Sequence, residues 1–175
     1  GLLNYIFPTI GTMLLLFGFR ALQHENKWFK RCFIISIIRT AYFFWMLIWN
    51  TTILHSTIYS SAMNTVLFIE NLVLQSALFV CLWPGFLSIR QKAGLSPHAG
   101  SAAALIVWYC LICLLALVHY NGFIIALIMF IAYCRIIYKL NKLSKELDEA
   151  GYEISDVPVK WTNRRITIAL LVLLL

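Results

Sequence analysis

Long runs of apolar residues, separated by short polar stretches, make up most of the chain. Six such runs can be distinguished, at residues 2–19, 32–50, 63–87, 102–118, 123–138 and 166–175. None of them shows the alternation of apolar and polar residues that marks a transmembrane β-barrel. Roughly 20 apolar residues cross the hydrocarbon core of a bilayer as a helix. The pattern therefore predicts an all-α, polytopic membrane helical bundle with about six transmembrane helices.

The last run, residues 166–175, covers about half of one bilayer crossing. We therefore expect the sixth helix to be truncated and the natural polypeptide to continue beyond it. The interruptions between the six runs are short. Residues 1–175 are accordingly predicted to form a single transmembrane helical domain.

Apolar residues continue at helical spacing after the fifth run, now among lysines and acids. Leu140, Leu143 and Leu147 recur every three or four positions, which is typical of an amphipathic helix. Gly151 supplies a helix stop. Residues 139–165 are therefore predicted to form an amphipathic cytoplasmic extension of helix five and a return loop.

Glycine and proline predict local features inside two of the helices. Gly11 and Gly18 lie close to one face of the first helix, where we expect close packing against a neighbouring backbone. The Pro84–Gly85 pair should kink or end the third helix.

The composition also indicates an integral membrane protein. Hydrophobic residues make up 62% of the 175 residues, charged residues make up 12%, and the mean hydropathy is +0.84. Soluble domains are about half apolar and about a quarter charged. Lipid is therefore expected to be the main solvent of this chain.

The basic residues predict an orientation in the membrane. Every Lys and Arg other than Arg39 lies in or beside the connections after the first, third and fifth runs. The connections after the second and fourth runs contain none. This asymmetry predicts that the basic connections are cytoplasmic and that both chain ends are extracytoplasmic, in the cell (plasma) membrane.

The net charge of +7 raises the question of nucleic-acid binding. No basic face carries interleaved aromatic residues, so no nucleic-acid partner is expected. The expected partners are the lipid bilayer, with anionic headgroups at the basic cytoplasmic loops, and a second copy of the chain or a partner membrane protein.

Arg39 and Glu70 are the charged residues that stand alone inside long apolar runs. A charge at the bilayer centre costs roughly 2.5 to 3.5 kcal/mol on insertion scales, so such charges are usually paired or line a wet cavity. At 1.5 Å per residue, Arg39 would lie about 10 Å from one surface and Glu70 about 12 Å from the other. In a core of about 30 Å their depths would differ by roughly 8 Å, which an extended arginine can bridge. An Arg39–Glu70 ion pair across one antiparallel hairpin is therefore expected.

Further polar residues surround this pair at helical spacing and define a candidate intramembrane polar site. Its members are Arg39, Glu70, Asn71, Gln75, Ser36 and Thr40. One interpretation is interhelical hydrogen bonding that holds the bundle together. The other is a cavity for a polar solute or an ion, with Glu70 as a protonatable group whose pKa Arg39 would set.

Cysteine and histidine give weaker signals. Cys110 and Cys113 have the spacing of a thiol redox pair but lie within the fourth apolar run, where burial raises a thiol pKa. His55 and His119 could approach each other outside the membrane, but no third ligand is in view. We expect no metal site and no cofactor.

Three classes of function follow. The first is a non-enzymatic anchoring, assembly or sensory module of a longer membrane protein. The second is a small-solute or ion transporter or channel subunit that uses the polar seam around Arg39 and Glu70. The third is membrane thiol redox activity at Cys110 and Cys113. The first is the preferred interpretation, because the short outer connections leave little room for an extracytoplasmic site.

Overall fold

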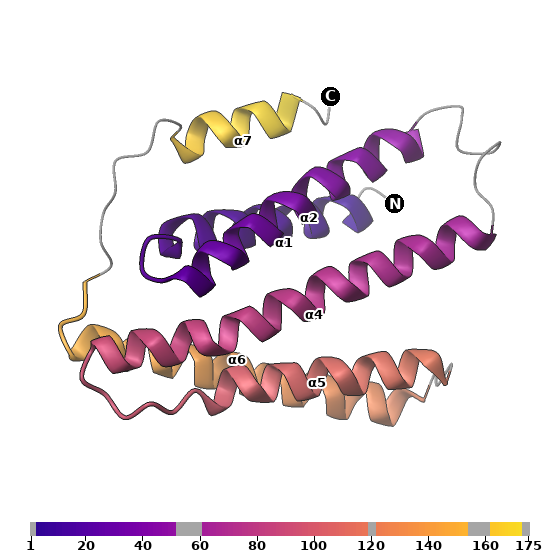
Figure 1. Ribbon diagram of the computed structural model, residues 1–175. Helices are drawn as coiled ribbons and strands as arrows, with labels where there is room; N and C mark the ends of the chain where they lie inside the picture. The colour runs from indigo at the N-terminus through magenta and orange to yellow at the C-terminus, as the bar shows by residue number, and fades with distance from the viewer. Residues whose placement is uncertain (1–2, 52–60, 119–121, 154–161, 173–175) are drawn as a thin grey trace. The chain divides into compact units, whose positions relative to one another are not determined.

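The computed structural model of the 175-residue chain describes residues 3–51, 61–118, 122–153 and 162–172. Within these ranges the chain forms six α-helices and no β-strand, which confirms the predicted all-α class (Figure 1). The helices are α1 (Leu3–Leu22), α2 (Lys27–Thr51), α4 (Ser61–Lys92), α5 (Gly100–Leu117), α6 (Phe123–Glu149) and α7 (Asn163–Val172). Each of the six predicted apolar runs contributes to one of them.

Among the described residues, four helices are long and apolar enough to cross a membrane. They are Lys27–Trp49 of α2, Thr65–Lys92 of α4, Gly100–Leu117 and Phe123–Glu149. The apolar part of α1, Ile6–Leu22, is shorter. Length and composition thus suggest membrane embedding, whereas the count of about six crossings and the position of the chain ends stay predictions.

The described helices bury an apolar core and also leave many large apolar side chains on their surface. Arg20, Glu25 and Arg90 are each less than a tenth exposed, at 9%, 6% and 8%. Many large apolar side chains lie on the surface: Phe123 is 79% exposed and Val118 is 75% exposed. Because an exposed apolar surface of this extent is rare on soluble monomers, the helices are suited to an apolar solvent.

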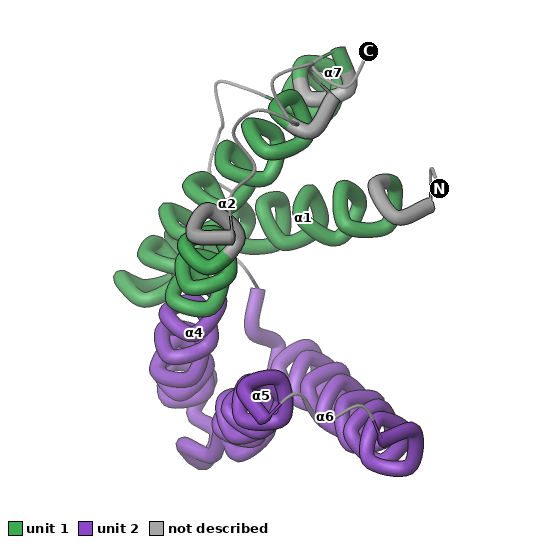
Figure 2. The backbone as a smooth tube through the Cα atoms, turned by 90° about the vertical axis from the view of Figure 1, so that its right-hand side faces the viewer, with its two compact units in different colours: residues 1–74, 155–175 green, residues 75–154 purple. Residues whose placement is uncertain are grey.

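The chain divides into two compact units (Figure 2). Unit 1 comprises residues 1–74 and 155–175, and unit 2 comprises residues 75–154. In unit 1, α1 packs against α2; in unit 2, α5 packs against α6. The helix α4 contributes its first part to unit 1 and the rest to unit 2. The predicted single domain over residues 1–175 stays a prediction.

A short turn joins α1 to α2 and carries the helix cap of α2. The side-chain oxygen of Asn26 accepts hydrogen bonds from the backbone N–H groups of Trp28, at 3.0 Å, and Phe29, at 2.9 Å. An Asn at this position satisfies donors that the first helical turn leaves without partners. Phe29 and Cys32, both 0% exposed, then belong to the buried core of unit 1.

Both helices that end at a basic connection in unit 2 finish with the same glycine motif. Gly94 after α4 and Gly151 after α6 have φ angles of 69° and 70°. The N–H of Leu95 donates to the carbonyl of Arg90 at 2.9 Å, and that of Tyr152 donates to the carbonyl of Leu147 at 3.1 Å. These are Schellman motifs, which need a left-handed residue after the helix. The α6 helix therefore continues past residue 138 and stops beside Gly151, while residues 154–161 of the predicted return loop lie outside the described residues.

One local prediction is narrowed and another needs correction. The third helix does not end at the Pro84–Gly85 pair, because α4 continues to Lys92, and the alternative of a kink there stays a prediction. A proline removes one backbone donor, and membrane helices tolerate this loss when neighbouring groups satisfy the freed carbonyl. Gly11 and Gly18 do not pack closely against a neighbour, since a Cβ atom at either position would meet nothing within 4 Å.

Substitution of Gly151 by alanine should destabilise the protein by about 1 to 2 kcal/mol, because a non-glycine residue resists the left-handed conformation. Thermal unfolding of the detergent-solubilised chain, followed by circular dichroism, measures this loss. The matched control is Gly18→Ala in α1, where open space and a helical conformation predict no loss and a gain of up to about 1 kcal/mol. Equal unfolding midpoints for the two variants would contradict the helix-stop role of Gly151.

Candidate functional site

A small cavity in unit 1 contains one member of the candidate polar site. It has a volume of about 190 Å³ and lies between α2 and the first half of α4. Its lining residues are Tyr42, Trp45, Met46, Trp49, Val66, Leu67 and Glu70. The α2 residues recur every three or four positions, so that one face of this helix forms one wall. Glu70, from α4, is the one charged group among these lining residues.

Arg39 lies on the same face of α2, one helical turn before Tyr42. It is half-buried, and its Nη1 atom is buried. Arg39 is not among the residues that line the cavity. The expected Arg39–Glu70 ion pair stays a prediction.

The remaining members of the predicted seam lie in different surroundings. The buried hydroxyls of Ser36 and Thr40 donate to carbonyls of their own helix, to Cys32 at 2.8 Å and to Ser36 at 2.7 Å. Such bonds satisfy the hydroxyl protons without a partner from another helix. Asn71 is exposed, and Gln75 belongs to unit 2. The cavity thus brings Glu70 to the aromatic face of α2 and does not include the other five residues.

The aromatic wall of this cavity was not predicted from the sequence. Trp45 and Trp49 contact each other with ring centroids 5.9 Å apart and an interplanar angle of 44°. Together with Tyr42 they place three aromatic residues in the same cavity lining as Glu70. The sequence feature that could have predicted this wall is the recurrence of Tyr42, Trp45 and Trp49 at helical spacing, in the same apolar run as Arg39.

A second polar cluster, in unit 2, joins the end of α4 to the last turns of α6. Arg90 Nη1 donates to Glu146 Oε2 at 2.8 Å, and Arg90 Nε donates to the carbonyl of Ser96 at 2.8 Å. The side chain of Arg90 is 10% exposed and that of Glu146 is 38% exposed. Sequence reasoning had treated Arg90 only as a basic residue that sets orientation. The structure shows that it also holds the loop after α4 and the α6 extension together.

This cluster changes the titration of Glu146, which lies in the polar last turns of α6, beyond its apolar stretch. The hydrogen bond from Arg90 is the main cause that lowers the pKa of Glu146. Partial burial acts in the opposite direction, and the positive charges of Arg90 and Lys142 lower the pKa further. A charged acceptor strengthens the hydrogen bond, so the pair is strongest with Glu146 ionised.

Unit 1 contains a comparable contact. Arg20, in the last turn of α1, donates from Nη1 to the side-chain oxygen of Asn163 at 2.8 Å. Asn163 is the first residue of α7. In each unit, therefore, a buried arginine at the end of one helix binds a segment distant in sequence.

The fourth and fifth predicted runs pack as α5 and α6 around a larger apolar cavity in unit 2. Its volume is about 720 Å³. The indole N–H of Trp108 donates to the carbonyl of Met129 at 2.9 Å, and the rings of Trp108 and Tyr133 lie 4.8 Å apart. These contacts tie the two helices together beside the cavity.

The structure describes the two cysteines of the thiol prediction but not the two histidines of the metal prediction. Cys110 is exposed and Cys113 is half-buried on α5, and neither forms a disulfide. In the part of the chain that the structure describes, no group of three or more metal-ligating side chains occurs. His55 and His119 lie outside the described residues.

Comparison of the chain with protein-family models, with curated proteins and with solved structures finds no match. Function therefore has to be argued from the chemistry of the sites themselves. The two polar clusters and the aromatic cavity supply that chemistry.

Substitution of Glu146 by glutamine should lower the unfolding midpoint at neutral pH, because the buried Arg90 loses its charged acceptor. The pKa of Glu146 is lowered in the folded protein. Its stabilising effect is therefore complete above the pKa of an unfolded glutamate and is lost as the pH falls through the lowered folded value. Unfolding midpoints measured at a series of pH values should show the difference from wild type shrinking on acidification.

The matched control for this experiment is Glu149→Gln, on the exposed end of the same helix. Its midpoint should stay close to that of the wild type across the same pH range. A neutral-pH midpoint of Glu146→Gln equal to that of Glu149→Gln would contradict the structural role of the Arg90–Glu146 pair.

Proposed function

We propose that this chain is a non-enzymatic, membrane-embedded helical module that serves in anchoring, assembly or sensing. The observation that carries the proposal is the set of long apolar helices whose surfaces expose many large apolar side chains. A surface of this kind is suited to lipid and to other membrane helices. The partner protein is proposed to be a membrane protein or a second copy of this chain.

The buried arginines support a structural role for the polar groups. Arg20 binds Asn163, and Arg90 binds Glu146 and Ser96. The hydroxyls of Ser36 and Thr40 are occupied within their own helix. These contacts stabilise the helical units and leave few of the predicted seam residues for a solute pathway.

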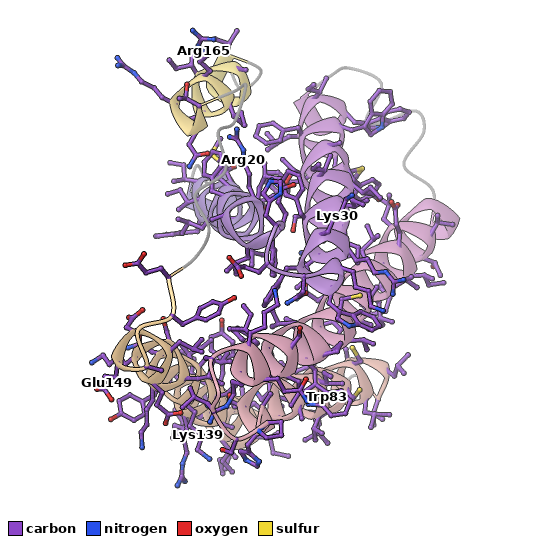
Figure 3. All side chains as sticks on the ribbon, turned by 60° about the vertical axis from the view of Figure 1, so that its left-hand side comes forward. Arg20, Lys30, Trp83, Lys139, Glu149 and Arg165 are labelled. Atoms are coloured by element: carbon purple, nitrogen blue, oxygen red, sulfur yellow. The ribbon has the colours of Figure 1, made fainter. Side chains whose placement is uncertain are left out.

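The proposed topology has about six crossings, with α1 and α7 included. In this arrangement the connections after α1, α4 and α6 are cytoplasmic, both ends are extracytoplasmic, and the membrane is the cell membrane. The lysines on the α6 extension support it, since Lys139 (labelled in Figure 3), Lys142 and Lys145 are exposed and can contact anionic headgroups. Trp28 supports it at the start of α2, where it packs under Arg31 with 4.7 Å from guanidinium carbon to ring centroid.

This topology predicts that two introduced cysteines lie on opposite sides of the membrane and differ in their labelling. Gln91→Cys, at the exposed end of α4, should react with a membrane-impermeant maleimide only after cells are permeabilised. Val118→Cys, after α5, should react in intact cells. Labelling of the wild type, with its five free cysteines, is the background to subtract. Labelling of Gln91→Cys in intact cells would contradict the orientation.

A second candidate function is a small-solute or ion transporter or channel subunit that uses the seam around Arg39 and Glu70. The cavity between α2 and α4 favours it, because Glu70 lines a space rather than packing against side chains throughout. An ionisable residue at membrane depth is often functional.

Reconstituted liposomes separate the two candidates. If the chain is a structural module, Glu70→Gln should leave ion and solute flux at the level of the wild type, and Arg39→Ala should lower stability by about 1 to 2 kcal/mol. A flux that the wild type supports and a folded Glu70→Gln variant abolishes would overturn the module in favour of a transporter. Flux assays and thermal unfolding on the same preparations provide both measurements.

A further inference from the structure

We propose that the cavity between α2 and α4 is a binding site for a small organic cation of the alkylammonium class. Glu70 would supply the counter-charge, and Tyr42, Trp45 and Trp49 would supply the aromatic wall. The site rests on the second candidate function, which it deepens by naming the ligand class, although binding itself can be measured without transport.

The charge of the cavity selects the sign of the ligand. Glu70 lies in the apolar stretch of α4 and is the one charged group among the described lining residues. A carboxylate at membrane depth is costly unless an opposite charge compensates it. A bound cation provides this compensation at the place where the cavity leaves space.

The aromatic wall selects an organic cation over a metal ion. Tyr42, Trp45 and Trp49 project from one face of α2, and the two indoles lie 5.9 Å apart. A cation within about 6 Å of such rings is attracted by their π faces, and Trp is the most effective ring. Calcium and magnesium instead need about six or more oxygen ligands. The lining side chains offer only the Glu70 carboxylate and the Tyr42 hydroxyl.

The size of the cavity limits the ligand. Its 190 Å³ is below the roughly 300 to 1,000 Å³ of sites for drug-sized molecules. Met46, Val66 and Leu67 complete an apolar lining that suits methyl groups better than a hydrated ion. A single ammonium group with short alkyl substituents fits these limits.

Arg39 is the natural competitor of such a ligand. It lies one turn before Tyr42 on the same face of α2 and carries the charge that was predicted to pair with Glu70. A bound cation and the Arg39 guanidinium would therefore be alternative counter-charges for one carboxylate. The substitution Arg39→Met removes the positive charge and keeps a long side chain. It should therefore tighten binding of an added cation.

The test is equilibrium dialysis of the full chain in detergent micelles against radiolabelled tetramethylammonium, with sodium chloride held constant. The wild type should bind saturably, at about one site per chain. Glu70→Gln should raise the dissociation constant at least tenfold, Trp49→Leu at least fivefold, and Trp49→Phe by less than Trp49→Leu. Arg39→Met should lower it.

Matched controls are Glu149→Gln and Trp83→Phe, which change an exposed charge and an exposed indole of unit 2 that do not line the cavity; both residues are labelled in Figure 3. Both should bind as the wild type does. Circular dichroism identifies any variant that fails to fold, and the Trp49→Leu and Trp49→Phe pair then tests the site without Glu70→Gln.

Non-saturable uptake, or equal affinity in the wild type and in folded Glu70→Gln and Trp49→Leu variants, would overturn the site. Equilibrium dialysis detects binding whether or not flux occurs. The cation site and the transporter function can therefore be overturned independently of each other. Glu70-dependent flux of another solute without tetramethylammonium binding would overturn the cation site and leave the transporter. Saturable binding without flux would support the site alone.

Discussion

Hydrocarbon cannot hydrogen-bond a peptide group, and this constraint underlies the rest of the structure. Each unsatisfied backbone N–H or C=O would cost several kcal/mol in lipid, so the apolar runs must satisfy their backbone internally as helices. The helix ends need separate solutions. Asn26 caps the start of α2, and Gly94 and Gly151 close the ends of α4 and α6.

The same constraint explains where the buried charges lie. Long basic side chains at helix ends can reach polar groups without entering the apolar part of the bundle. Arg20 and Arg90 use this position to bind Asn163 and Glu146, and each contact joins segments that are distant in sequence. Basic residues that would orient a chain in a membrane thereby also stabilise its helical units.

Glu70 differs from these end charges because it lies within an apolar stretch. Its surroundings are aromatic rather than polar: a wall from α2 faces it across a small cavity. The hydroxyl groups of Ser36 and Thr40 are bound within α2 and do not extend the polar surroundings by donating across to another helix. A cavity lined by one glutamate and several aromatic residues suits a different ligand from a continuous seam of polar side chains.

By itself the sequence determined the all-helical class, the approximate helix bounds and the stop at Gly151, because the length of apolar runs and the backbone freedom of glycine act locally. It also singled out Glu70, since a lone charge in an apolar run is visible without coordinates. Only the tertiary structure decided that Arg90 turns inward to Glu146 and that the aromatic face of α2 meets Glu70. A basic residue at a helix end can face headgroups or a neighbouring helix equally well, and an aromatic stripe can face lipid or a cavity. Which of these occurs depends on the packing of distant segments, which no local pattern encodes.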